Sequence, residues 1–312
     1  MNGIRQGGTA LVTALLVVAL ASVAATGLLE RQRIDIRRTA NLLTLDQAFA
    51  YARAAESWAV AVLRRDATEN RHDSRLDKWA ALFEPIPIDD GSLTAQVVDQ
   101  QALFNLNNLV DASGKPSQKD IAAFERLLAA LELDTTLAGA VLDWIDADSN
   151  VATHGAEDND YLRRDVPYRA ANRAMAAVSE LRQVRGIESE VYDKLAAYVT
   201  ALPERTTVNV NTAPVPVLMA VVKGLSTSAA ATILATREVT PYEDENAFRG
   251  QQALEGLQVD GIGVSSDYFL IESRVRLGRS RIVHNTLVKR GATTGDQPGV
   301  IEILARSRGG LS

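Results

Sequence analysis

The residues best suited to chemistry are six carboxylates in one short segment. Asp143 to Asp160 reads DWIDADSNVATHGAEDND, and its carboxylates are Asp143, Asp146, Asp148, Glu157, Asp158 and Asp160. The segment contains no lysine or arginine. Clustered like charges are unfavourable unless something neutralises them, and Ca²⁺ takes roughly six to eight oxygen ligands. We therefore predict a structural Ca²⁺-binding loop with these six carboxylates as candidate metal ligands.

Part of this loop is similar to an EF-hand. Asp146, Asp148 and Asn150 occupy the first, third and fifth positions, and Glu157 falls at the twelfth. The sixth position, where an EF-hand requires glycine, is Val151. The predicted Ca²⁺ loop is therefore irregular, and a solvated acidic loop that caps a helix is the alternative.

Catalytic chemistry has little support elsewhere in the sequence. We find no Walker A, GxSxG or HExxH motif, and nothing specifies a nucleophile for a metal-dependent hydrolase. There is no cysteine, and the three histidines are scattered. A net charge of −6 disfavours a general nucleic-acid binder, which is normally basic. We predict that the protein is not an enzyme and binds no nucleic acid.

An apolar segment near the N-terminus is long enough to cross a membrane. A polar leader ends in Gly7-Gly8, and the uncharged run from Thr9 to Leu29 follows at once. Such a run, as a helix, matches the roughly 30 Å hydrocarbon core of a bilayer. Small residues between Ala19 and Ala25 leave a cleaved Sec signal peptide as the alternative.

The elements that must position the acidic loop begin with this helix. No proline or glycine interrupts Glu30 to Arg65, and apolar residues from Ile34 and Leu42 onward recur at helical spacing. We predict one continuous helix from about Thr9 to Arg65, with its first half in lipid. Its second half is amphipathic and needs a sheet to cover its apolar face.

Strand patterns flank a helical middle of the chain. Ser92–Asp99 alternates apolar and polar residues, and so do Tyr268–Leu277, Arg281–Arg290 and Gly299–Arg306 near the end. Between them, Ser117–Leu202 is helical, as an insertion into a sheet would be. The pattern predicts an α+β fold with a helical domain, which carries the acidic loop, inserted into an antiparallel sheet.

Two short units in the middle of the chain are similar to helix-hairpin-helix modules. One surrounds Gly186 and the other surrounds Gly224, with Lys223 and Arg237 as sparse basic support. The second also resembles a unit of competence-type DNA-binding proteins. A membrane-anchored DNA-binding protein is therefore the alternative function, and packing or protein-contact modules are the other interpretation of these units.

The order of motifs resembles that of the K-type minor pseudopilins of type II secretion. Gly8-Thr9 is similar to the junction that prepilin peptidase cuts in type IV pilins and pseudopilins. The fifth mature residue would be Thr13, where most pilins have glutamate. The other matching segments are FNLN (104–107), the acidic loop with Glu157-Asp158-x-x-Tyr161, and NVNTA (209–213).

This resemblance implies a type IV pilin-like fold and no catalysis. It implies a leader (1–8), a transmembrane half-helix (9–29), a pilin-like domain in two parts (30–110 and 266–312), an inserted α-helical domain (111–205) and a second helical hairpin module (206–265). Family members bind Ca²⁺ in the insertion. The resemblance also implies that the leader would be cut between Gly8 and Thr9, and methylation of the mature N-terminus is common in the family.

The resemblance also implies a place and partners. The protein would be a single-pass inner-membrane protein with its C-terminal domain in the periplasm. It would cap the pseudopilus tip, initiate its assembly and support protein export across the outer membrane. Its partners would be the I-type and J-type minor pseudopilins, prepilin peptidase and the inner-membrane secretion platform. Thr13 suits a tip subunit, since no amine of a subunit above it needs a carboxylate, and the bulky insertion would block further stacking.

Overall fold

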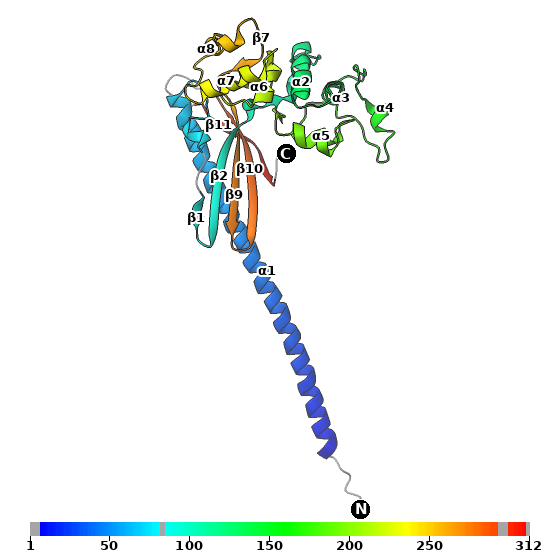
Figure 1. Cartoon of the computed structure of the whole chain (residues 1–312). Helices are drawn as coiled ribbons and strands as arrows, with labels where there is room; N and C mark the ends of the chain where they lie inside the picture. Colours follow the sequence, from blue (N-terminus) through cyan, green and yellow to red (C-terminus); the bar gives the residue numbers. More distant parts are fainter. Residues whose placement is uncertain (1–6, 82–84, 293–298, 310–312) are drawn as a thin grey trace, which may run out of the picture.

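A single long helix extends from the rest of the molecule in the computed structural model, which describes residues 7–81, 85–292 and 299–309 (Figure 1). Helix α1 (Gly7–Glu69) is continuous, as predicted. Its apolar first part is long and apolar enough to cross a membrane and has no contact with the sheet (Figure 1). Met1–Gln6, most of the predicted leader, lie outside the described residues.

Five antiparallel strands form the main sheet, in the order β1-β2-β9-β10-β11. They are β1 (Ile86–Ile88), β2 (Gly91–Asp99), β9 (Tyr268–Leu277), β10 (Ser280–Arg290) and β11 (Ile301–Arg308). The four predicted strands are confirmed, with ends shifted by at most two residues. β2 pairs directly with β9, from Gly91 opposite Leu277 to Asp99 opposite Phe269. Everything between these two strands is therefore an insertion into the sheet.

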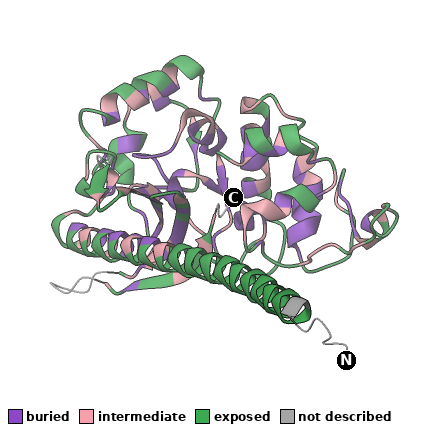
Figure 2. Cartoon of the chain, turned by 90° about the horizontal axis from the view of Figure 1, so that it is seen from below, coloured by how far each residue is buried: buried purple, intermediate pink, exposed green. Residues whose placement is uncertain are grey.

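The second half of α1 packs on the sheet through a face of small residues. Its buried positions recur every three or four residues and are Ala48, Ala52, Ala55, Ala59 and Leu63. They contact sheet residues such as Ile271 and Val275. Figure 2 shows burial on this part of the helix only. The prediction that Ile34 and Leu42 share the covered face is wrong, because they precede the sheet and are 62% and 54% exposed.

The insertion is a helical domain with one hydrophobic core. Its helices are α2 (Gln118–Ala130), α3 (Leu137–Ile145), α4 (Asp158–Tyr161), α5 (Ser189–Leu195), α6 (Val215–Val221), α7 (Thr227–Arg237) and α8 (Glu245–Arg249). A single buried cluster runs from Phe104 to Ile262. Residues of both predicted segments, 111–205 and 206–265, contribute to it. The predicted α+β architecture with an inserted helical domain is confirmed.

Buried asparagines join distant loops at the start of the insertion. The Asn105 side chain accepts from the Leu202 amide at 3.1 Å and donates to the Glu204 carbonyl at 2.8 Å. The Asn107 amide group donates to the Leu202 carbonyl at 2.8 Å. Each polar group is thereby satisfied without water. The FNLN motif therefore closes the base of the insertion.

A buried carboxylate joins α1 to the sheet. Glu56 accepts from Arg306 of β11 at 2.7 Å, from the Thr286 hydroxyl at 2.7 Å, and lies 3.2 Å from a ring nitrogen of His284. Arg306 above all, with Thr286 and His284, lowers the pKa of Glu56 to about 2, although burial opposes this shift. The ionised form of Glu56 is therefore the form that holds the helix to the sheet.

We predict that Glu56→Gln destabilises the fold by about 2 kcal/mol at pH 7, because it removes the charged acceptor of several buried hydrogen bonds. The folded pKa is lowered from 4.5. The contribution of Glu56 is therefore present above that pH and is lost as the pH falls towards about 2. Thermal unfolding in detergent micelles should show the difference between wild type and variant shrinking over this range.

Glu302→Gln, an exposed change on β11, is the control. An equal difference at every pH would contradict this assignment.

Candidate metal centre

The acidic loop connects α3 to α4 at the far side of the helical domain (Figure 1). An aromatic layer supports it. Trp144 lies edge-on to Tyr161 with ring centroids 5.3 Å apart, and Tyr161 lies 5.3 Å from Tyr168. Packing therefore fixes the two helix ends that carry the carboxylates. The conformation of the loop between them depends on its polar contacts.

Three of the six predicted ligands are buried together. Asp143, Asp146 and Glu157 have at most 3% of their surface exposed. Asp143 accepts from the Ala152 amide at 3.1 Å. A Cβ on Gly155 would come within 1.9 Å of the Asp143 carboxylate, so that position needs glycine. Oδ1 of Asp146 and both carboxylate oxygens of Glu157 have no hydrogen-bond partner.

Burial and mutual repulsion disfavour ionisation of this group. The pKa of Asp146 is raised to about 6, by burial first and then by Asp148 and Asp143. The pKa of Glu157 is raised to about 7, by burial and then by Asp143 and Asp146. Buried carboxylate oxygens without partners are costly. A hard cation bound among them would relieve both the desolvation and the repulsion.

The other three predicted ligands have partners in the protein. Asp148 accepts from the Asn150 amide at 2.7 Å. Asp158 pairs with Arg169 at 3.1 Å, and Asp160 pairs with Arg185 at 3.0 Å. Asp158 and Asp160 therefore already have their charge compensated by arginine.

Two residues missed at the sequence level complete the loop. Arg185 donates to the carbonyls of His154 and Gly155, in addition to its ion pair. Asn172 donates to the Asp148 carbonyl at 3.2 Å, and its own Oδ1 is buried without a partner. Both come from segments after the loop, so no spacing within the acidic segment could have indicated them.

The donor set fits a hard divalent cation such as Ca²⁺. Asp143, Asp146 and Glu157 would hold it, and the side-chain Oδ1 of Asn172, which contacts the loop at Asp148, is a further oxygen without a partner. All of these are oxygen ligands, which Ca²⁺ prefers. No three loop carboxylates place ligand atoms within 4.8 Å of one another, a spacing reached among the described residues only by Asp66, Asp73 and Asp77. The loop would therefore have to tighten around an ion.

The two hairpin units have the turns that short helices require, but one of the basic residues of the second unit is buried. Gly186 and Gly224 both have φ of +85°, as turns between short helices require. However, Arg237 is only 4% exposed and donates to the Val210 carbonyl inside the domain. Of the two basic residues of the second unit, Lys223 is exposed and Arg237 contributes to packing inside the domain. A single exposed basic residue favours the interpretation as a packing module over DNA binding.

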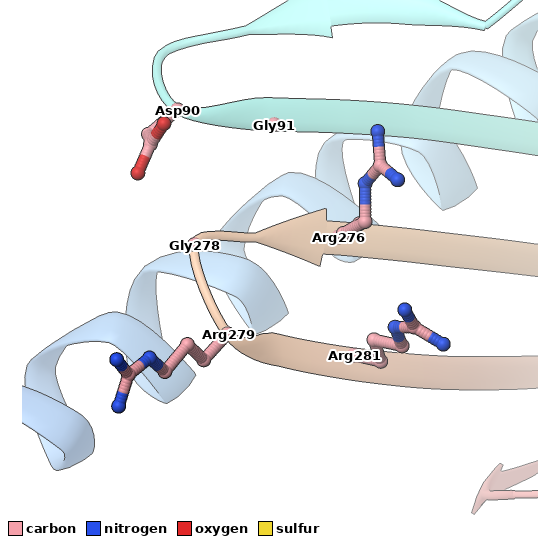
Figure 3. Close-up of a pocket in the computed structure, with 6 residues that line it drawn as sticks. All are labelled: Asp90, Gly91, Arg276, Gly278, Arg279 and Arg281. Atoms are coloured by element: carbon pink, nitrogen blue, oxygen red, sulfur yellow. The ribbon is translucent and has the colours of Figure 1, made fainter.

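A separate basic surface lies at the sheet end nearest the apolar half of α1 (Figure 1), and Figure 3 shows it in close-up. Arg276, Arg279 and Arg281 surround the β9–β10 turn, opposite Asp90 of the β1–β2 turn. Figure 3 shows the three guanidinium groups pointing in different directions. All of these side chains are exposed, so the surface is a solvated charged edge and we assign it no ligand.

The fold and the loop together define a class of protein. A long helix that is apolar in its first half, an antiparallel sheet on its second half and a helical domain inserted into that sheet make this a pilin-like subunit. Residues 102–204 and 208–267 match the family described as "Type II secretion system (T2SS), protein K". The chain belongs to this family, which is a structural component of a secretion system and not an enzyme family.

Individual relatives agree with this assignment. The chain is 37% identical to the type II secretion system protein K of Pseudomonas aeruginosa, over 97% of this chain and 93% of that protein. It is 33% identical to that of Klebsiella pneumoniae, over 93% of this chain and 95% of that protein. A chain in the crystal structure of the GspK-GspI-GspJ complex from enterotoxigenic Escherichia coli superposes with a TM-score of 0.76 at 29% identity, covering 88% of this chain and 99% of that one. The predicted type IV pilin-like fold is confirmed.

We predict that Ca²⁺ bound in the acidic loop slows trypsin cleavage after the exposed Arg163, two residues beyond the end of α4. If Ca²⁺ binds only the closed loop, cleavage should slow about 100-fold at a concentration 100 times the dissociation constant. Glu157→Gln should remove most of this protection, because it neutralises a buried carboxylate with no other partner. Cleavage rates with Ca²⁺ and with chelator measure the effect.

Asp158→Asn and Asp160→Asn are the matched variants. We expect both to keep the Ca²⁺ protection, since their carboxylates pair with Arg169 and Arg185. Equal loss in all three variants would contradict the division of the six carboxylates, and cleavage unaffected by Ca²⁺ in the wild type would contradict the metal site.

Proposed function

We propose that this protein is a minor pseudopilin that caps the tip of the type II secretion pseudopilus. There it initiates pseudopilus assembly and supports protein export across the outer membrane. The observation that carries the proposal is the similarity, over nearly the whole of the other chain, to a member of the GspK-GspI-GspJ complex. By this similarity its immediate partners are an I-type and a J-type minor pseudopilin.

The unpartnered part of α1 supports assembly with other helices. Apolar side chains that precede the sheet are 54% to 64% exposed and are Ile34, Ile36, Leu42 and Leu43. An exposed apolar stripe of this kind is favourable only when another surface covers it. We assign it to the helices of neighbouring subunits, next to the segment embedded in lipid.

The position of the helical domain supports a place at the tip. It lies at the end of the sheet opposite the N-terminus (Figure 1). A subunit added beyond that end would meet the inserted domain instead of the helix of this chain. The pseudopilus could therefore continue only below this subunit.

Thr13 agrees with this place. Its hydroxyl donates to the Thr9 and Ala10 carbonyls, each at 3.0 Å, so it is satisfied within its own helix. A glutamate at this position would be a costly charge in lipid unless an amine of another subunit paired with it. A tip subunit has no subunit above it to supply that amine.

The remaining features follow from the same assignment. Prepilin peptidase would cut between Gly8 and Thr9, and the mature N-terminus would be methylated. The chain would cross the inner membrane once, contact the secretion platform there and hold its folded domain, with structural Ca²⁺, in the periplasm. Among the residues that the structure describes, one helix has the required length and hydropathy, which supports the single crossing.

We predict that the protein occupies one end of each pseudopilus. The sequence has no cysteine, so Ala235→Cys on the exposed surface of α7 gives a unique attachment site for a maleimide-gold label. Electron microscopy of labelled pseudopili should show a single label at one end. The doubly substituted Thr13→Glu, Ala235→Cys chain should lose this placement or assemble poorly, because it adds an unpaired carboxylate.

Unsubstituted protein treated with the same reagent is the control for non-specific label. Labels distributed along the shaft would contradict the tip assignment. Normal terminal placement of the Thr13→Glu chain would contradict only the explanation given for Thr13.

A further inference from the structure

Three carboxylates come together where α1 ends. Asp66 lies in the last turns of α1, and Asp73 and Asp77 lie in the segment that follows it. One oxygen atom of each lies within 4.8 Å of the others. Asp66 is 6% exposed and Asp73 only 1%, whereas Asp77 is half-buried. This cluster is separate from the acidic loop, and no motif in the sequence indicates it.

The positive charge in contact with the cluster does not balance it. Arg290 of β10 pairs with Asp66 at 3.3 Å and with Asp73 at 2.5 Å. Asp77 receives only neutral donors, the Ser74 amide at 2.6 Å and the Asn70 side chain at 3.2 Å. One guanidinium group therefore faces three carboxylates.

The basic residues next to Asp77 in sequence do not correct this imbalance. Arg75 donates to the Thr212 carbonyl, and Lys78 pairs with Glu69. The cluster therefore has more negative than positive charge at a site where two of its three carboxylates are buried.

One buried oxygen in the cluster lacks a partner. Oδ2 of Asp73 accepts from Arg290 and from the Ser266 amide at 2.7 Å, but Oδ1 has no hydrogen-bond partner. A buried carboxylate oxygen left unpaired costs the full desolvation of that atom. This orphan oxygen is independent of the grouping of the three residues, and it is what a missing cation would leave behind.

We propose that Asp66, Asp73 and Asp77 bind a hard divalent cation of the Ca²⁺ type. The donors are carboxylate oxygens, and Ca²⁺ or Mg²⁺ fills its remaining positions with water. The half-exposed side of Asp77 gives the ion and its water molecules access. Neither nitrogen nor sulfur donors are present in the cluster, which disfavours zinc and copper.

The ion would join three parts of the fold. Asp66 belongs to α1 and Arg290 to β10, while the Asp73 amide donates at 2.8 Å to the Val264 carbonyl, in the segment that returns from the helical domain. A cation here would fix the end of the long helix to the sheet and to the base of the insertion. The inference rests on this junction alone and needs neither the tip assignment nor the acidic loop.

Equilibrium dialysis of the full chain in detergent micelles against Ca²⁺ tests the proposal. The loop is first disabled with Asp146→Asn and Glu157→Gln, so that only the junction can bind. We expect this loop variant to retain one Ca²⁺ equivalent, and the further change Asp77→Asn to remove it. Asp77→Asn keeps the side-chain acceptor for the Ser74 amide and leaves Arg290 its two partners, so the fold should be retained.

The matched control is the loop variant with Asp90→Asn, an exposed aspartate in the β1–β2 turn, which should keep the equivalent. Terbium luminescence sensitised by Trp79, two residues from Asp77, gives a second readout that should follow the same order. Thermal unfolding confirms that each variant is folded. No bound Ca²⁺ in the loop variant, or an equivalent that survives Asp77→Asn, would overturn the proposal.

Discussion

The packing of the second half of α1 against the sheet is the contact on which the rest of the structure depends. Alanines at 48, 52, 55 and 59 let the helix axis approach the strands closely, and Glu56 adds a charged link to the last strand. The first half of the same helix has no such cover. The second half of α1 therefore belongs to the folded domain. The first half is an uncovered apolar helix that must be buried in lipid or against other helices.

The sheet can carry a large insertion because the two ends of the insertion meet at one buried carboxylate, that of Asp99. Asp99 closes β2, and its Oδ2 accepts from the Ser266 hydroxyl at 2.8 Å, the Thr212 hydroxyl at 2.5 Å and the Asn209 side chain at 3.0 Å. The chain leaves and re-enters the sheet at this point. The helical domain can therefore have its own core and its own loop chemistry while β2 and β9 still pair as neighbours.

Sequence reasoning succeeded where the signal is local. Alternation and a turn predicted β9 to the residue, and the absence of proline and glycine between Glu30 and Arg65 predicted that α1 continues unbroken through this segment. Helical periodicity predicted which residues share one face of α1, but it could not show how much of that face the sheet covers. The prediction for Ile34 is wrong for this reason. Composition located the acidic loop. Arg169 and Arg185 come from later segments, so the sequence could not show which carboxylates of the loop form ion pairs and which do not. The ion pair between Asp73 and Arg290 could not be predicted from the sequence, because 217 positions separate the two residues.

The fate of α1 tests the account most directly, since a pseudopilin must keep the apolar half that a secreted protein loses. The measurement is the intact mass of the protein from cells with and without prepilin peptidase. We predict a chain that begins at Thr9, with or without a methyl group, when the peptidase is present, and an unprocessed leader when it is absent. A mature chain that begins near Ala25, or a leader retained in both strains, would contradict the account.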